Sequence, residues 1–168
     1  MRQRPVAILI FGILNLGFGL LHLISPLFAL AMRKIKLPSQ PALTALYSDP
    51  SYIAWQHVSM VVGVVSGLAL LAFGVGLLLC KNWARLGSIV YAVLDCAFVV
   101  VGCVVSWPFM EMAIQQAPKV SQGFAKAAGV IGMVFGLVIG LAYPVLLLIF
   151  MTRSNVIEAC QPEPPPPG

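Results

Sequence analysis

Four long apolar stretches alternate with short polar or charged segments along the chain. The hydrocarbon core of a bilayer is about 30 Å thick, so a helix needs roughly 20 apolar residues to cross it. Each stretch meets that length, and only a helix satisfies its own backbone hydrogen-bonding groups within a single segment in lipid. We therefore predict four transmembrane helices, at about residues 6–32, 53–80, 83–109 and 127–151.

The spacing of these stretches predicts an all-α fold, a four-helix transmembrane bundle. Alternation of period two, which marks transmembrane strands, is absent from all four stretches. Only Lys81 and Asn82 separate the second stretch from the third, so we expect a short tight hairpin between direct neighbours. Asp49 followed by Pro50 is typical of an N-cap with proline at the first helical position, and it predicts the start of the second helix.

The remaining segments complete a single domain over residues 1–160. The third connection, about Met110 to Lys126, contains Pro118 and has room for a short surface helix. The tail, residues 161–168, is a proline run, for which we expect an extended, disordered stub.

Composition supports a membrane location. Hydrophobic residues make up 60% of the 168 residues, and charged residues only 9%. About a quarter of the residues of a soluble domain are charged, so this chain has too few charges to cover a water-facing surface. Its ten Lys and Arg residues are scattered singly and form no basic patch, which argues against a nucleic-acid partner.

Counting Lys and Arg does not decide the orientation of the chain in the membrane. With the amino terminus inside, five of these residues flank each side, so the positive-inside rule gives a tie. The charge of a free amino terminus favours both termini in the cytoplasm. So does the position of Cys80 and Cys160, which would then both lie on the reducing side.

An alternative interpretation makes residues 1–31 a cleaved secretory signal. Arg2 and Arg4 precede an apolar run, and Ala29–Ala31 has the form of a cleavage site. The run from Val6 to Ile24 has 19 residues, whereas the apolar region of a signal has about 7–15. We expect this segment to remain as the first of four helices.

Small residues recur at helical spacing, and in lipid such residues allow helices to approach closely. Gly63 and Gly67 lie four residues apart in the second predicted helix, and Gly132, Gly136 and Gly140 repeat that spacing in the fourth. We expect both rows to be packing seams of the bundle. The alternative is that the row in the fourth helix serves self-association or a pore. One seam of the first predicted helix carries Gly12, Asn15, Gly19, His22 and Pro26.

Asp95 is the only formal acid inside the predicted spans, and it lies near the middle of the third. A charged Asp at that depth costs about 2.5–3.5 kcal/mol, so we expect it to find polar partners, first of all Asn15 and His22 of the first helix. We hypothesise that these three residues form an intramembrane polar cluster. It either carries protons or binds a cation, or it fixes the register of the bundle by hydrogen bonds. Further groups that can approach Asp95 are Tyr91, Ser66 and Tyr143.

Motifs of other chemistry are missing from the sequence. It contains no C-x-x-C, no G-x-S-x-G, no H-E-x-x-H and no pair of neighbouring carboxylates. We therefore expect no catalytic activity, no cofactor and no metal site. The expected partners are the lipid bilayer and, through the glycine seams, a second copy of the chain or another membrane protein.

Three short motifs carry a resemblance to known proteins: Arg4–Val6 leading into Ile13–Gly17, Lys81–Arg85, and Tyr143-Pro144 ahead of Arg153–Val156. In these motifs the chain resembles the uncharacterised small four-span integral membrane proteins of bacteria. The resemblance implies the four-helix architecture and a place in the bacterial inner (plasma) membrane. It implies no activity and no site residues.

Taken together, these observations favour a multi-pass membrane protein of structural, scaffold or accessory type. The alternative function is a small proton-linked transporter or channel subunit that uses Asp95 with His22 and Asn15. A polar stripe shared by two helices would discriminate between the two functions, and only the first predicted helix carries one.

Overall fold

The computed structural model describes residues 6–34, 41–116 and 118–160, so the predicted tail at residues 161–168 lies outside the described residues. The described part of the chain is helical throughout apart from short connections. Its elements in chain order are α1 (Val6–Lys34), α2 (Pro41–Ser48), α3 (Pro50–Leu78), α4 (Asn82–Gln115), the 3-10 turn η1 (Lys119–Ser121), α5 (Gln122–Met151) and α6 (Ser154–Cys160).

The predicted fold class is confirmed, because the described residues form an all-α structure with four long apolar helices. These helices, α1, α3, α4 and α5, are each long and apolar enough to cross a membrane. The boundaries in the third connection differ from the prediction. Helix α4 continues past Pro108 to Gln115, and α5 begins at Gln122, so only the single turn η1 occupies the space expected for a surface helix.

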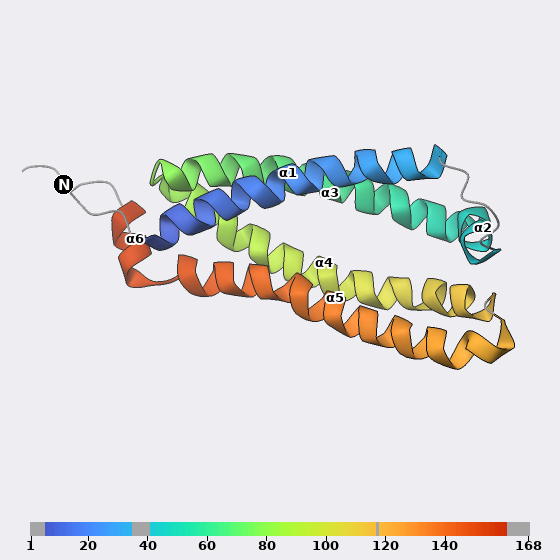
Figure 1. Cartoon of the computed structure of the whole chain (residues 1–168). Helices are drawn as coiled ribbons and strands as arrows, with labels where there is room; N and C mark the ends of the chain where they lie inside the picture. Colours follow the sequence, from blue (N-terminus) through green and yellow to red (C-terminus); the bar gives the residue numbers. More distant parts are fainter. Residues whose placement is uncertain (1–5, 35–40, 117, 161–168) are drawn as a thin grey trace, which may run out of the picture.

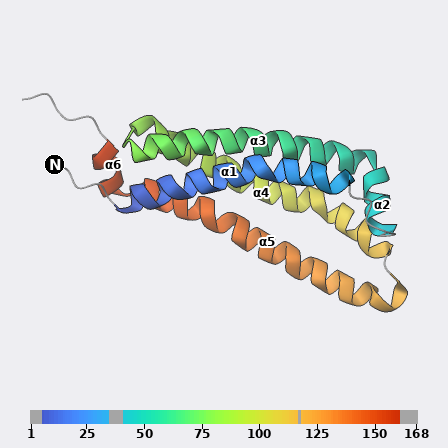
Figure 2. The ribbon, with the colours of Figure 1, turned by 45° about the horizontal axis from the view of Figure 1, so that its top comes forward.

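The four long helices run alternately up and down (Figure 1). Helix α1 lies along α3, and α4 lies along α5, while α3 and α4 are joined at one end by the tight turn at residues 79–81. The short helix α2 sits at the opposite end of the bundle, where it contacts α3 and α4. Figure 2 shows that α5 approaches α1 near α6 and diverges from it toward the α2 end.

The most extensive helix–helix contact in the described structure joins α1 to α3 at glycines. A Cβ atom on Gly67 would lie 2.9 Å from the carbonyl oxygen of Gly19, and one on Gly74 would lie 3.0 Å from the carbonyl oxygen of Gly12. Real Cβ atoms essentially never come so close to backbone, so the two backbones approach to a distance that only glycine allows at these positions.

Leucines interlock with the same glycines. Leu23 covers Gly67 and Leu71 covers Gly19, each with its side chain about where a glycine Cβ would stand. Leu16 and Leu78 repeat this arrangement at Gly74 and Gly12. The two glycines of each helix lie seven residues apart, as do the two leucines, which is the repeat that keeps one face of a helix toward its partner.

Two of the predicted packing glycines, Gly132 and Gly136, meet no neighbouring helix in the described part of the chain, and Gly63 meets α1 only loosely. No other part of the described structure lies within 4 Å of a Cβ built on Gly132 or Gly136, and Gly63 meets only the His22 carbonyl oxygen, at 3.9 Å. On α5 the row turns away from its neighbours because a spacing of four residues advances about 40° around a helix at each step. Gly140 still faces α4 and meets Val99, but Gly136 and Gly132 are turned progressively away.

The predicted start of the second transmembrane helix is confirmed. A side-chain oxygen of Asp49 accepts a hydrogen bond from the backbone N–H of Tyr52, at 2.9 Å, and Pro50 occupies the first helical position. Such an N-cap satisfies one of the four unpaired N–H groups at the start of a helix.

Helix α6 closes the end of the bundle opposite α2. Val156 and Cys160 are buried there, and the Arg85 guanidinium of α4 donates a hydrogen bond to the Met151 carbonyl oxygen at 3.3 Å. Burial of the Cys160 thiol and the neighbouring Cys80 raise the pKa of Cys160, while Arg85 acts in the opposite direction. Both cysteines therefore lie at the same end of the bundle.

The α1–α3 contact predicts opposite effects for two Gly→Ala substitutions. Gly67→Ala should lower the free energy of unfolding by about 1–3 kcal/mol, because the new methyl group overpacks the seam. Gly136→Ala is the matched control and should leave stability unchanged or raise it by about 0.5–1 kcal/mol, since alanine favours the helix and meets open space. Unfolding by SDS titration in mixed micelles measures both. Equal effects of the two substitutions would contradict the seam.

The environment of Cys160 predicts slow alkylation. In variants that keep a single cysteine, Cys160 should react with a water-soluble maleimide more slowly than Cys80, because it is buried and its raised pKa leaves less thiolate at neutral pH. Its rate should increase as the pH rises and on unfolding in SDS. Fast labelling of Cys160 in the folded protein would show that α6 does not pack against the end of the bundle.

Candidate intramembrane site

Asp95 lies deep in the membrane-spanning part of the bundle. It is 13 residues beyond the start of α4, which corresponds to about 20 Å at 1.5 Å per residue. Measured along their own helices from the same end of the bundle, Ser66 of α3 and His22 of α1 lie at depths of about 18 and 24 Å. Three helices therefore contribute a polar side chain at nearly the same depth.

Two groups interact electrostatically with the Asp95 carboxylate. The Tyr91 hydroxyl, one turn earlier on α4, points into the same space and lies within electrostatic reach of the carboxylate. The imidazole of His22 lies within electrostatic reach from α1. A phenol donor and a titratable base thus meet the acid far from either membrane surface.

Asn15 is bonded to a different residue. Its side-chain oxygen accepts a hydrogen bond from the hydroxyl of Tyr143 on α5. The ring of Tyr143 packs beside Phe11 and Phe18 of α1, with centroids 6.4 and 4.4 Å apart. Asn15 is completely buried, and its Nδ2 has no hydrogen-bond partner in the described part of the chain. This pair therefore ties α1 to α5 near the end at which they converge.

The hypothesised cluster of Asp95, His22 and Asn15 thus takes a more extended form. Tyr143 interacts electrostatically with both Asp95 and Tyr91, so it links the Asn15 pair to the acid. The structure brings His22 to Asp95, whereas it connects Asn15 only through Tyr143. The sequence pointed to Tyr143 as a neighbour of Asp95 but did not indicate that it pairs with Asn15.

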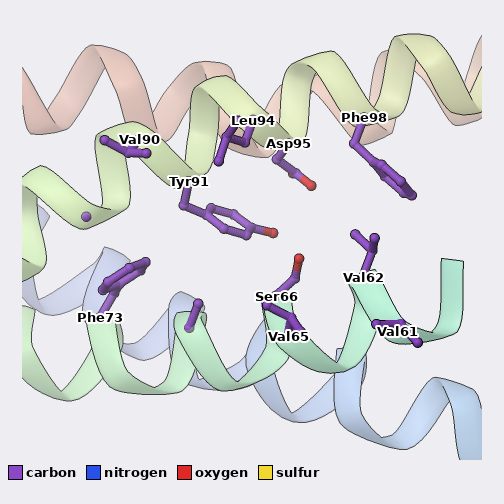
Figure 3. A pocket seen from close by; sticks show the side chains of 12 residues that line it. Val61, Val62, Val65, Ser66, Phe73, Val90, Tyr91, Leu94, Asp95 and Phe98 are labelled. Carbon is purple, nitrogen blue, oxygen red and sulfur yellow. The ribbon is translucent and has the colours of Figure 1, made fainter. Parts of the chain in front are cut away.

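A groove of about 640 Å³ runs between α3 and α4 beside Asp95. We call it the Asp95 groove; α3 lines it between Val61 and Phe73, and α4 lines it between Gly87 and Phe98. Figure 3 shows that Asp95 and Tyr91 from α4 and Ser66 from α3 direct their oxygen atoms into the same space. Apolar side chains form the remaining walls.

The Asp95 groove opens on the outer surface of the bundle. Four of its lining residues, Val61, Val65, Val90 and Leu94, are 59–65% exposed. In a membrane-spanning bundle, such an apolar surface faces lipid tails. The carboxylate therefore sits in a depression that is accessible sideways from the bilayer.

A second cavity, of about 270 Å³, lies between the same two helices toward the α2 end. Its lining includes the polar side chains of Gln56, Ser59 and Ser106. Trp55, which lines this cavity, stacks on Phe98, which lines the Asp95 groove, with ring centroids 5.8 Å apart. This aromatic pair connects the linings of the two spaces.

Comparison with known proteins finds no matching family model, no matching curated protein and no matching solved structure. The four apolar spans define the class: the chain is a multi-pass integral membrane protein. Among the residues that the structure describes, no group of three or more His, Cys, Asp or Glu side chains is placed to hold a metal ion. The groups available for chemistry in the site are thus an acid, an imidazole, hydroxyls and an amide.

The Asn15–Tyr143 pair predicts a specific pattern of stabilities. Tyr143→Phe should lower the free energy of unfolding by about 1–3 kcal/mol, because it leaves the buried amide without its donor. Asn15→Leu in the Tyr143→Phe background should recover part of this loss, since no unpaired polar group then remains. A double-mutant cycle measures the coupling. Strictly additive effects would show that the two side chains do not interact in the membrane-embedded protein.

Proposed function

We propose that the protein is a small proton-linked membrane transporter or channel subunit in which Asp95 takes up and releases the proton. One observation carries this proposal: the Asp95 carboxylate faces the groove. A carboxyl group that only held helices together would point into a helix–helix seam, where an amide or hydroxyl serves as well. A carboxylate that faces an accessible space is placed to exchange its proton or bind a ligand.

The surroundings of Asp95 supply what proton exchange needs. The imidazole of His22 is a second group that can hold a proton, and it lies within electrostatic reach of the acid from another helix. The Tyr91 hydroxyl points into the same space from one turn earlier on α4. The polar cavity toward the α2 end supports an access route for protons from that side.

A second candidate function is that of a scaffold or accessory protein that associates with a further copy or another membrane protein. The outward faces of Gly132 and Gly136 on α5 favour it, because both meet open space within the described structure. Small residues on a lipid-facing surface permit close approach of another helix. This candidate makes no use of the Asp95 groove, so the two functions are separable by experiment.

We also propose a place in the bacterial inner membrane with both termini in the cytoplasm. The end of the bundle that carries α6, Cys80 and Cys160 would then face the reducing side, and α2 and η1 would face outward. Free cysteines at the inner face agree with that orientation.

Proton flux into proteoliposomes with an imposed pH gradient tests the proposed function. The wild-type protein should dissipate the gradient faster than empty vesicles, and Asp95→Asn should reduce the rate to that of empty vesicles because its amide cannot carry a proton. Glu111→Gln is the matched control: Glu111 is exposed and accepts a hydrogen bond from Trp107 at 3.1 Å, an interaction that glutamine preserves. It should retain the wild-type rate.

Two outcomes would oppose the proposal. Equal flux in the wild type and Asp95→Asn would remove Asp95 from the pathway. Flux no greater than that of empty vesicles for the wild type, in a preparation shown to be folded, would favour the scaffold candidate.

A further inference from the structure

We infer that the Asp95 groove binds a hydrophobic organic cation, such as an amphiphilic ammonium compound, that enters sideways from the bilayer. This inference deepens the proposed function and rests on it, because the cation and the proton would compete for the same carboxylate. It is nevertheless testable by binding alone, without any flux.

The size and lining of the groove fit such a ligand. A volume of about 640 Å³ lies within the range of about 300–1,000 Å³ that is typical of sites for small molecules. Phe73 and Phe98 lie toward opposite ends of the groove, and the Tyr91 ring lies between them (Figure 3). Aromatic faces attract organic cations as well as apolar groups.

The opening of the groove selects ligands that are dissolved in the membrane. Its rim is formed by the exposed aliphatic side chains of Val61, Val65, Val90 and Leu94. A small hydrated ion gains nothing from such a rim and would lose its water at the entrance. An amphiphile with a long apolar body partitions into the bilayer first and meets the groove at the depth of its rim.

The charge of the site selects a cation among such amphiphiles. The groups that face Asp95 are His22 from α1, Tyr91 from α4 and Tyr143 from α5, while α3 contributes the neutral Ser66. Only His22 can add positive charge. With His22 neutral and Asp95 ionised, the groove holds one negative charge in surroundings of low dielectric constant, where attraction to a cation is strong.

Exchange of a proton for the ligand cation at the Asp95 carboxylate leaves the net charge of the groove unchanged. When the carboxylic acid releases its proton, the O–H bond breaks, the proton passes to water outside the groove, and the carboxylate pairs with the positive head of the ligand. Binding of one cation displaces one proton. Acid should therefore weaken binding of the cation and leave binding of a neutral analogue unchanged.

A pair of fluorescent probes with the same apolar body tests the inference. Diphenylhexatriene is neutral, and its trimethylammonium derivative carries one positive charge. Energy transfer from tryptophan to each probe is measured with the full-length protein in nanodiscs of neutral lipid, against empty nanodiscs. Trp55 stacks on Phe98 at the edge of the groove and is the expected donor. The wild-type protein should bind the cationic probe at least about tenfold more tightly than the neutral one.

Three variants make the result specific. Asp95→Asn keeps the shape of the side chain and should bind both probes equally. Val65→Phe should weaken binding of both, because Val65 is an exposed residue of the rim and the larger ring fills the groove without adding a tryptophan donor. Glu111→Gln, which removes an acid far from the groove, should behave as the wild type. Unfolding curves in SDS confirm that each variant is folded.

The outcomes separate this inference from the proposed function. Equal affinity of the wild type for the two probes, or an unchanged preference in Asp95→Asn, would overturn the cation site even if proton flux depends on Asp95. Preferential binding that is lost in Asp95→Asn, without proton flux, would support the site and overturn the transport function instead.

Discussion

The close contact of α1 and α3 is the constraint on which the rest of the structure depends. Glycines spaced seven residues apart on both helices let the two backbones touch, and leucines from the opposite helix fill the space beside them. The contact of Gly19 with Gly67 also sets the depth of the site. His22 follows Gly19 by less than one turn, and Ser66 directly precedes Gly67, so the seam holds both polar side chains at the depth of Asp95.

The pair formed by α4 and α5 is attached to α1 at one end only. Near α6, the Asn15–Tyr143 pair and the rings beside it join α1 to α5. Toward α2 the two helices separate (Figure 2). The two spaces lie between α3 and α4, where the Asp95 groove and the smaller polar cavity are found.

The four helices were predictable because length and hydropathy in lipid leave little choice. The short connection at Lys81 and the N-cap at Asp49 could also be predicted from the sequence, since both depend on residues that are neighbours along the chain. The packing faces of the helices were not predictable. Gly132 and Gly136 have the same spacing as Gly63 and Gly67, but a spacing of four residues rotates around the helix. Which glycines another helix covers therefore depends on where that helix lies.

The site was predictable in its chemistry but not in its geometry. A lone acid at mid-membrane indicates that polar partners exist, and His22 was identified because it lies at a matching depth on a helix of the same direction. The pairing of Asn15 with Tyr143 depends on the tilt of α5, and the groove depends on where α3 and α4 separate. Neither is encoded in the local sequence.

Infrared difference spectroscopy of the protein in lipid bilayers tests most directly the claim that Asp95 is an exchangeable acid in an accessible groove. A carbonyl band of a protonated carboxyl group should be present in acid, disappear reversibly as the pH rises and be absent from Asp95→Asn. It should also shift quickly on transfer to deuterated water. A band from Asp95 that does not respond to pH or to deuterium would show that the carboxyl group is sealed within the bundle and only holds its helices together.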